Sequence, residues 1–287
     1  MRPNATEPVH WTAADARGSL TPPADSDDKY SRGVLGFATG SIAYPGAAII
    51  GVDAALHTGV GMVRYLGPEP VGSLVLQRRP EAVLGDGRVH AWVVGSGMTG
   101  EEPEALGRVG SALAIGAPAV VDAGAIGAEL VGPTIITPHA GELAKLLGIE
   151  RSEVSADPAA SARQAAKAHG AVVLIKGATT FVTDGFRVVS VAEATPWLAT
   201  AGAGDALAGV LGALIAARAA SGPVSADDLL ALGATAAFVH GRAARLAAAG
   251  PRSRYAVDEA GRPAGGGPFT ILELNAGIPD VVRGLLG

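Results

Sequence analysis

The chain has 287 residues, a formal net charge of −5 and no cysteine. The lack of cysteine excludes disulfides, thiolate catalysis and cysteine-ligated zinc or iron–sulfur sites. An acidic balance without a basic stripe argues against sequence-independent nucleic-acid binding. A hydrophobic share of 48% with only 4% aromatic residues favours close packing of helices on a sheet over an aromatic-rich β-sandwich.

The first part of the chain, residues 1–28, is polar and contains several prolines, so it is predicted to form an extended arm before a single α/β domain at 29–287. Met1 to His10 lack a basic start followed by an apolar run, and the longest apolar stretches are interrupted by polar residues or glycine. The sequence therefore predicts a cytoplasmic protein without a secretory signal or a membrane partner.

Apolar segments alternate with helical patterns along the domain. Strands are predicted at residues 33–37, 62–65, 91–94, 119–122, 135–136 and 171–175, and a hairpin at 180–183 and 187–191. Helices are predicted at residues 47–56, 102–115, 141–147, 161–169, 205–219, 227–249 and near 278–286. This alternation predicts a mostly parallel sheet with helices on both faces. Ligands of such sheets gather at the carboxyl ends of the strands.

The sharpest local signal is Thr200-Ala201-Gly202-Ala203-Gly204-Asp205, which precedes a long apolar helix. Small residues let the backbone approach a ligand, and the helix start offers free N–H groups and the positive end of the dipole, as a phosphate requires. Asp205 would lie beside that phosphate and could take a proton from an attacking hydroxyl. The alternative is that Asp205 is only an N-cap and the glycines only a loop.

Two further loops follow predicted strands. Gly95-Ser96-Gly97-Met98-Thr99-Gly100 is a weak match to a dinucleotide fingerprint, and it is interpreted as a backbone loop lining a substrate cleft or as a tight turn. Tyr44-Pro45-Gly46-Ala47-Ala48 joins the first strand to the first helix. Its amides could face a ligand, although a structural turn explains it as well.

Charged and imidazole side chains mark two more strand ends. Lys176, before Gly177-Ala178-Thr179-Thr180, suits a phosphate or ribose contact, or is a solvated lysine before a turn. His139 lies near a helix N-terminus, where a neutral hydrogen-bonding role is favoured over a cation. Glu142 could reach metal-bound water, but His139 could equally be a cap and Glu142 a surface residue. No metal ligands are assigned, because the other histidines lack ligand spacing: His10, His57, His90, His169 and His240.

Several segments occur in a characteristic order. The first are Lys29-Tyr30-Ser31-Arg32-Gly33, Gly40-Ser41, Tyr44-Pro45-Gly46-Ala47-Ala48 and Gly59-Val60-Gly61-Met62-Val63. The later ones are Gly95-Ser96-Gly97, Thr137-Pro138-His139-Ala140-Gly141-Glu142, Val173-Leu174-Ile175-Lys176-Gly177-Ala178-Thr179-Thr180 and Gly202-Ala203-Gly204-Asp205-Ala206-Leu207-Ala208-Gly209. In this order they resemble the ADP-dependent NAD(P)H-hydrate dehydratase family. Single motifs occur in other ribokinase-like enzymes, but the ordered set is much more specific.

The resemblance implies a ribokinase-like three-layer αβα sandwich that repairs hydrated NADH or NADPH, with ADP as co-substrate and Mg²⁺. It implies that Asp205 is the base activating the ring hydroxyl and that Gly202, Ala203 and Gly204 hold the transferring phosphate. The nucleotide site it implies consists of Lys176, Gly177, Ala178, Thr179, Thr180 and Gly204. The substrate contacts it implies are Ala47 or Ala48, Gly97, His139 and Asp205. A homo-oligomer, such as a tetramer, is also expected from the resemblance.

The chain departs from the family pattern at three places. Ala203 replaces the usual Ser, Met98-Thr99 replaces a small apolar pair, and Gly124 replaces the second Asp of Asp-Ala-Asp. The segment before Lys29 is too short for the family's additional epimerase domain, so no epimerase activity is expected. Two alternatives stay open: a vitamin-precursor kinase of the same fold, and a catalytically silent nucleotide-binding protein.

Overall fold

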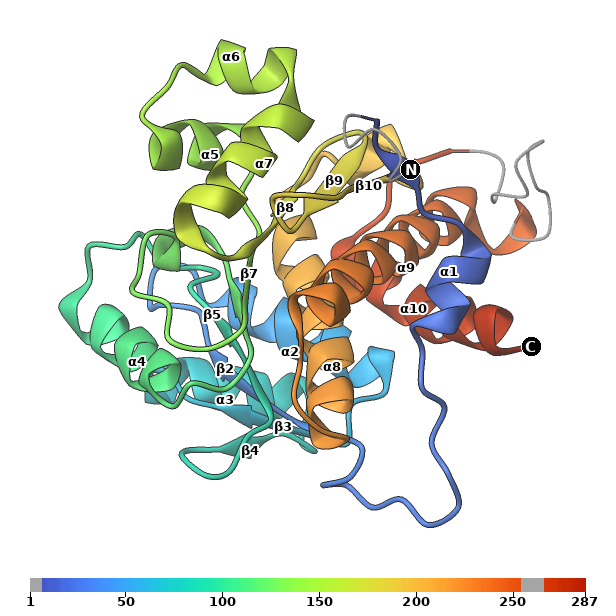
Figure 1. Cartoon of the computed structure of the whole chain (residues 1–287). Coiled ribbons are helices and arrows are strands. Elements are labelled where there is room, and N and C mark those ends of the chain that lie inside the picture. Colours follow the sequence, from blue (N-terminus) through green and yellow to red (C-terminus); the bar gives the residue numbers. More distant parts are fainter. Residues whose placement is uncertain (1–6, 254–265) are drawn as a thin grey trace.

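The computed structural model describes residues 7–253 and 266–287, with the side chains of 251–253 excepted. Its centre is a ten-stranded sheet with the order β1-β10-β9-β8-β7-β6-β5-β2-β3-β4 (Figure 1). The strands are β1 (Val9–His10), β2 (Val34–Ala38), β3 (Met62–Tyr65), β4 (Val83–Leu84), β5 (Ala91–Val94), β6 (Ala119–Val121), β7 (Thr134–Ile136), β8 (Val172–Ile175), β9 (Thr180–Thr183) and β10 (Val188–Val191). Neighbours are parallel except that β9 is antiparallel to β8 and β10. The predicted sheet and its hairpin are therefore confirmed.

Helices cover both faces of the sheet. One face carries α2 (Gly46–Thr58), α3 (Glu69–Arg78), α8 (Ala203–Ala220), α9 (Ala226–Ser253) and α10 (Ile271–Leu286). The other carries α4 (Pro103–Ala114), α5 (Ala140–Leu147), α6 (Arg151–Ala156) and α7 (Pro158–His169). Alternate residues of β8 serve the two cores, since Leu174 packs with the first group and Val173 with the second. Figure 1 shows the resulting three layers, as predicted.

Helix α8 lies in the centre of the first face, against α2 and strands β5 and β2. It approaches α2 closely at Gly209, where an added Cβ would lie 2.2 Å from the carbonyl oxygen of Gly51. Among the described helices, α8 alone is long and apolar enough to cross a bilayer, but 61% of it is buried inside the fold. Its apolar character is therefore explained by its place in the core, which fixes its first turn beside the strand ends.

The sequence analysis predicted an extended N-terminal arm, but part of this arm is folded onto the domain. Val9 and His10 add a parallel strand beside β10, and α1 (Ala13–Gly18) packs on α9 and α10. Trp11 donates its indole N–H to Thr235 Oγ1 at 3.2 Å, and Ala16 is fully buried. Short polar segments of this kind were missed because their partners lie far away in the sequence.

Beyond the arm, the elements without a prediction are α3, β4, α6 and two short 3-10 helices at Ala123–Ala125 and Pro196–Leu198. Helix α10 also begins at Ile271, several residues before the predicted start near residue 278, and Pro279 lies inside it. A capping box between Thr270 and Glu273 marks the true start, with the Thr270 amide donating to Glu273 at 2.6 Å. That pattern is present in the sequence but was not used to place the start of the helix.

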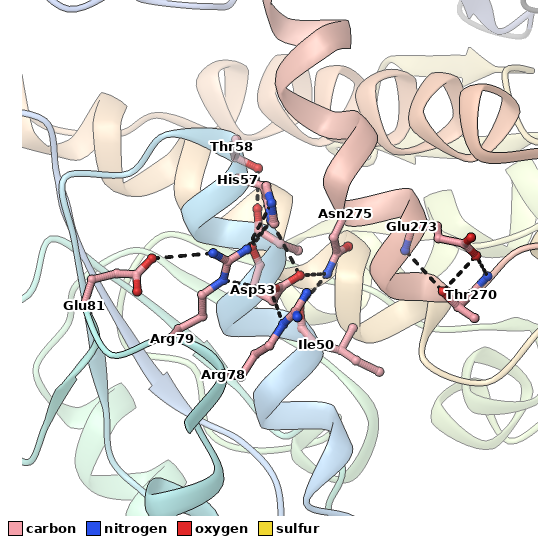
Figure 2. Close-up of polar contacts among 11 residues, drawn as sticks. Ile50, Asp53, His57, Thr58, Arg78, Arg79, Glu81, Thr270, Glu273 and Asn275 are labelled. Carbon is pink, nitrogen blue, oxygen red and sulfur yellow. Dashed lines mark hydrogen bonds and ion pairs between the residues drawn. The ribbon is translucent and has the colours of Figure 1, made fainter. Parts of the chain in front are cut away.

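A buried polar cluster joins α2, α3 and α10. Figure 2 shows Asp53 of α2 between Arg78, Arg79 and Asn275. Its carboxylate accepts hydrogen bonds from Arg78 at 2.9 Å, Arg79 at 2.8 Å and Asn275 at 2.8 Å. Asp53 is fully buried, and although burial raises its pKa, the bonds from His57 and Asn275 and the arginine charges bring it well below its usual value. The ionised cluster fixes α2 against both helices.

Candidate functional site

The small-residue loop ends at the start of α8. Gly202 is the N-cap in the left-handed conformation, with φ of 87°, where an L side chain would be strained. No side chain caps this helix, so its first turn presents amides suited to an anion. Asp205 is the third residue of the helix and is not its N-cap, so the capping interpretation of Asp205 is wrong.

The half-buried carboxyl group of Asp205 has an unusual protonation equilibrium. Burial and then repulsion from Asp122 raise the pKa of Asp205, Lys176 partly opposes both, and the resulting value is about 6. A carboxylate with a pKa near neutrality is a better proton acceptor than an ordinary aspartate. The first turn of α8 thus combines amides suited to an anion with a carboxylate suited to accepting a proton.

Asp122 is the centre of a polar network that the sequence did not reveal. It follows β6 and is 3% exposed. Its carboxylate accepts hydrogen bonds from Ser96 Oγ at 2.9 Å, Thr137 Oγ1 at 2.9 Å and Lys176 Nζ at 2.7 Å. Burial alone would raise its pKa, but the Lys176 charge and these bonds hold the pKa below its ordinary value, so Asp122 is ionised. The network links the carboxyl ends of four adjacent strands.

Lys176 is not a solvated lysine, because its side chain is 21% exposed and paired with Asp122. Its ammonium group also lies 3.9 Å from a Glu142 oxygen. An added Cβ on Gly204 would lie only 3.4 Å from Lys176 Nζ. The strand-end lysine and the small-residue loop, predicted separately, therefore meet at one place.

His139 and Glu142 form a reciprocal cap at the start of α5. His139 Nδ1 accepts from the amides of Gly141 at 3.0 Å and Glu142 at 3.1 Å, while Glu142 accepts from the His139 amide at 2.8 Å. An accepting Nδ1 must be unprotonated, which agrees with the neutral hydrogen-bonding role predicted for His139. The cap leaves Nε2 of His139 at an exposed edge of the site.

A cavity of about 590 Å³ opens beside these groups. The predicted residues that line it are His139, Lys176, Gly177, Ala178, Thr180, Ala203 and Gly204. Thr179, Gly202 and Asp205 do not line it. Its far end consists of residues that the sequence did not indicate: Val191, Ala194, Thr195, Pro196, Leu198, Ala199, Leu207, Ala237, His240 and Gly241. Burial lowers the pKa of His240 to about 4, so this wall is uncharged at neutral pH.

Of the predicted substrate contacts, His139 lines that cavity, Asp205 lies one residue beyond the lining residue Gly204, and Ala47, Ala48 and Gly97 form a second group outside it. A Cβ on Gly97, whose φ is 69°, would lie 2.5 Å from Ala47 Cβ, whereas Ala48 faces Gly40. Ala47 is therefore the better candidate of the two alanines. Ser96 connects this group to the cavity side through its bond to Asp122.

The comparisons with known proteins decide the family. A family model described as NAD(P)H-hydrate dehydratase matches residues 35–262 of the chain. The chain belongs to the NAD(P)H-hydrate dehydratase family. An ADP-dependent (S)-NAD(P)H-hydrate dehydratase of Xanthomonas campestris is 33% identical over 263 residues, which cover 83% of this chain and 88% of the relative.

Other relatives of the family are longer. The bifunctional NAD(P)H-hydrate repair enzyme of Mycobacterium tuberculosis is 39% identical over 236 residues, covering 77% of this chain but 49% of the relative. The chain thus spans about half the length of the first such relatives. The ADP/ATP-dependent NAD(P)H-hydrate dehydratase of Bacillus subtilis, co-crystallised with ATP and Mg²⁺, superposes with a TM-score of 0.81 at 23% identity, covering 98% of this chain and 99% of that one. The ribokinase-like fold expected from the sequence is thereby confirmed.

Two departures from the family pattern are in contact with each other. A Cβ on Gly124 would lie 2.5 Å from the carbonyl oxygen of Met98 and 2.7 Å from the amide of Gly100. The glycine loop therefore occupies the space that a side chain at 124 would need, and the two changes have to be considered together.

This contact predicts that Gly124→Ala destabilises the protein by about 1–3 kcal/mol, as overpacking typically does. The control is Gly107→Ala on α4, where an added Cβ meets no atom within 4 Å. That change should be neutral or stabilising by up to about 1 kcal/mol. Urea denaturation measures both, and equal midpoints for the two variants would contradict the close contact.

Proposed function

We propose that this chain dehydrates the S epimer of hydrated NADH or NADPH to NAD(P)H, using ADP and releasing AMP and phosphate. The observation that carries the proposal is the half-buried Asp205 carboxylate, with a pKa of about 6, in the uncapped first turn of α8 beside the cavity. The name of the Xanthomonas relative supports the choice of substrate.

In this proposal ADP lies in the cavity, with its β-phosphate at the amides of Ala203 and Gly204. Asp205 takes the proton of the ring hydroxyl while the hydroxyl oxygen attacks the β-phosphorus and the bond to AMP breaks. Hydroxide is a poor leaving group, but phosphate is a good one. Loss of phosphate together with a proton from the neighbouring carbon then restores the ring double bond.

The charge balance favours a divalent cation with the nucleotide. The carboxylates of Asp122 and Glu142 lie 2.7 and 3.9 Å from the ammonium group of Lys176, and Asp205 is a third carboxylate on which that charge acts. Within residues 7–253 and 266–287, no three acidic or imidazole side chains form a metal site. Mg²⁺ would thus be held mainly by the phosphates, with Glu142 reaching its water, and would neutralise phosphate charge.

The remaining assignments are part of the same proposal. Ala47, Gly97 and His139 contact the hydrated dinucleotide, and Lys176 through Thr180 line the nucleotide site. Thr179 has the weakest support, because it does not line the cavity. We also propose a cytoplasmic homo-oligomer without a nucleic-acid partner.

The decisive assay incubates the protein with hydrated NADH, ADP and Mg²⁺ and follows the absorbance of restored reduced nicotinamide. Restoration of NADH with equimolar AMP supports the proposal. No restoration, but phosphorylation of a hydroxymethyl pyrimidine or hydroxyethyl thiazole, supports a vitamin-precursor kinase. ADP binding without either product supports a catalytically silent protein. Parallel assays with ATP and with hydrated NADPH determine the preferred nucleotide and substrate.

The raised pKa of Asp205 predicts an acid limb in the pH profile. Only the deprotonated carboxylate accepts the hydroxyl proton, so kcat/KM should fall by about tenfold per pH unit below the pKa of the free enzyme. That limb should lie at pH about 6, where Asp205 titrates. A profile that stays level down to pH about 4, where an ordinary aspartate titrates, would contradict the raised value.

A further inference from the structure

We propose that Asp122 is a positioning residue that holds Lys176 away from Asp205 and so leaves the proposed base without an ionic partner. The inference rests on the proposed function of Asp205. Its physical basis is a competition in which two carboxylates share one neighbouring ammonium group.

Asp122 is held firmly in place. It is 3% exposed, and both carboxylate oxygens are engaged: Oδ2 accepts from Ser96 and Oδ1 accepts from Thr137 and Lys176. Two short side chains on neighbouring strand ends thus orient the carboxylate toward the lysine. A charge-assisted hydrogen bond of 2.7 Å to Lys176 is at the strong end of such interactions.

Lys176 is the cation that acts on Asp205. The charges that shift the Asp205 equilibrium are Asp122 and Lys176, with opposite signs. Among residues 7–253 and 266–287, Asp205 has no ion-pair partner, whereas Lys176 pairs with Asp122 at 2.7 Å and with Glu142 at 3.9 Å. The ammonium group is thus close enough to influence Asp205 but is held by the other carboxylates.

In the described part of the chain, Asp122 and Lys176 are the charges that act on Asp205, and the charged groups on the neighbouring helices are neutralised. On α2, Asp53 is engaged by Arg78 and Arg79. On α9, His240 is buried and neutral at physiological pH, since its pKa is about 4. Without the Asp122 charge, Lys176 is expected to pair with Asp205, which would lower the basicity of Asp205 and hold it away from a substrate hydroxyl.

The test is a titration of the Asp205 carboxyl carbon by NMR, with Asp205→Asn identifying its signal. Asp122→Asn keeps the shape of the side chain and removes its charge. We expect the Asp205 midpoint to fall by about 1–2 units, as for a carboxylate that gains a cationic neighbour. Asp157→Asn at the N-cap of α7, where Asn caps as well as Asp, is the control that should leave the midpoint unchanged.

Asp122→Asn could lower the Asp205 midpoint in two ways: Lys176 moves toward Asp205, or Asp205 is no longer repelled by the Asp122 charge. A double-mutant cycle separates these two effects. Lys176→Met should raise the Asp205 midpoint by a larger amount in the Asp122→Asn background than in the wild type. Equal shifts in the two backgrounds, or an unchanged midpoint in Asp122→Asn, would overturn the proposal. If Asp122→Asn does not fold, Asp122→Ser serves instead, because a hydroxyl can still bond to Ser96 and Thr137.

Activity gives the second readout. At saturating ADP, the acid limb of kcat/KM in Asp122→Asn should move with the NMR midpoint, and kcat should fall by at least about tenfold, since a weaker base is less effective. A wild type that titrates as expected but restores no NADH would refute the proposed function and leave the competition for Lys176 supported. A variant whose kcat and acid limb both match the wild type would refute the positioning role.

Discussion

Asp205→Asn is expected to lower kcat for the dehydration by about 10²–10⁴-fold, because loss of a general base typically has an effect of that size. ADP affinity should stay within about tenfold of the wild type, because the helix-start amides that bind the phosphate are unchanged. Single-turnover kinetics and ADP titration measure the two quantities separately. Full activity in this variant would refute the role of Asp205.

The stability of the same variant provides a control. Burial raises the folded-state pKa of Asp205 to about 6, so its ionisation disfavours the fold. Because the folded protein binds this proton more tightly than the unfolded chain, protonation of Asp205 stabilises the fold. This stabilisation is fully present below the unfolded pKa of about 3.9 and is lost as the pH rises through the folded pKa. Asp205→Asn should therefore be at least as stable as the wild type at pH 8, and a large loss of Tm would mean that the activity loss reflects unfolding.

Asp53→Asn is expected to give the largest loss of stability, about 2–4 kcal/mol at neutral pH. Removing one member of a fully buried ion pair costs about 3–5 kcal/mol. We expect a smaller loss of about 2–4 kcal/mol here, because the two arginines are partly exposed. The side chains of Arg78 and Arg79 are 40% and 22% exposed, while Asp53 is fully buried (Figure 2). Urea denaturation measures the change.

The pH dependence and a surface control test this account of Asp53. Its folded pKa lies below the unfolded value, so the stabilisation is complete above pH about 4 and is lost as the pH falls further. The difference in the free energy of unfolding between the wild type and Asp53→Asn should therefore become smaller at acid pH. Asp227, whose side chain is 76% exposed, pairs with Arg187, and its replacement by asparagine should cost at most about 1 kcal/mol. Equal losses for the two aspartates would contradict the buried cluster.

The sequence predicted the elements whose signal is local. Met62–Tyr65 and Ala91–Val94 were predicted with their observed bounds, because apolar runs between glycine or polar boundaries mark buried strands. The small-residue loop before an apolar helix likewise placed Asp205 in the first turn of α8. Lys176 and Gly204 were each singled out by their position after a strand or before a helix, and the fold brings them together.

The parts that were missed depend on contacts across the chain. Asp122 was noted as a strand end, but its partners Ser96, Thr137 and Lys176 come from three other strands, and no spacing reveals that they converge. His240 is a single histidine in an alanine-rich helix, so nothing local distinguishes it. The arm was predicted from its polar, proline-containing composition alone, and its pairing with β10 was missed because that pairing joins residues 9 and 189.

The central claim is that a nucleotide's terminal phosphate meets the Asp205 carboxylate at the start of α8. A crystal structure of the protein with ADP and Mg²⁺ tests it most directly. The account predicts adenosine in the cavity near Thr195 and Leu198, and the β-phosphate on the amides of Ala203 and Gly204. A β-phosphate bound elsewhere, with Asp205 facing away from it, would contradict the account.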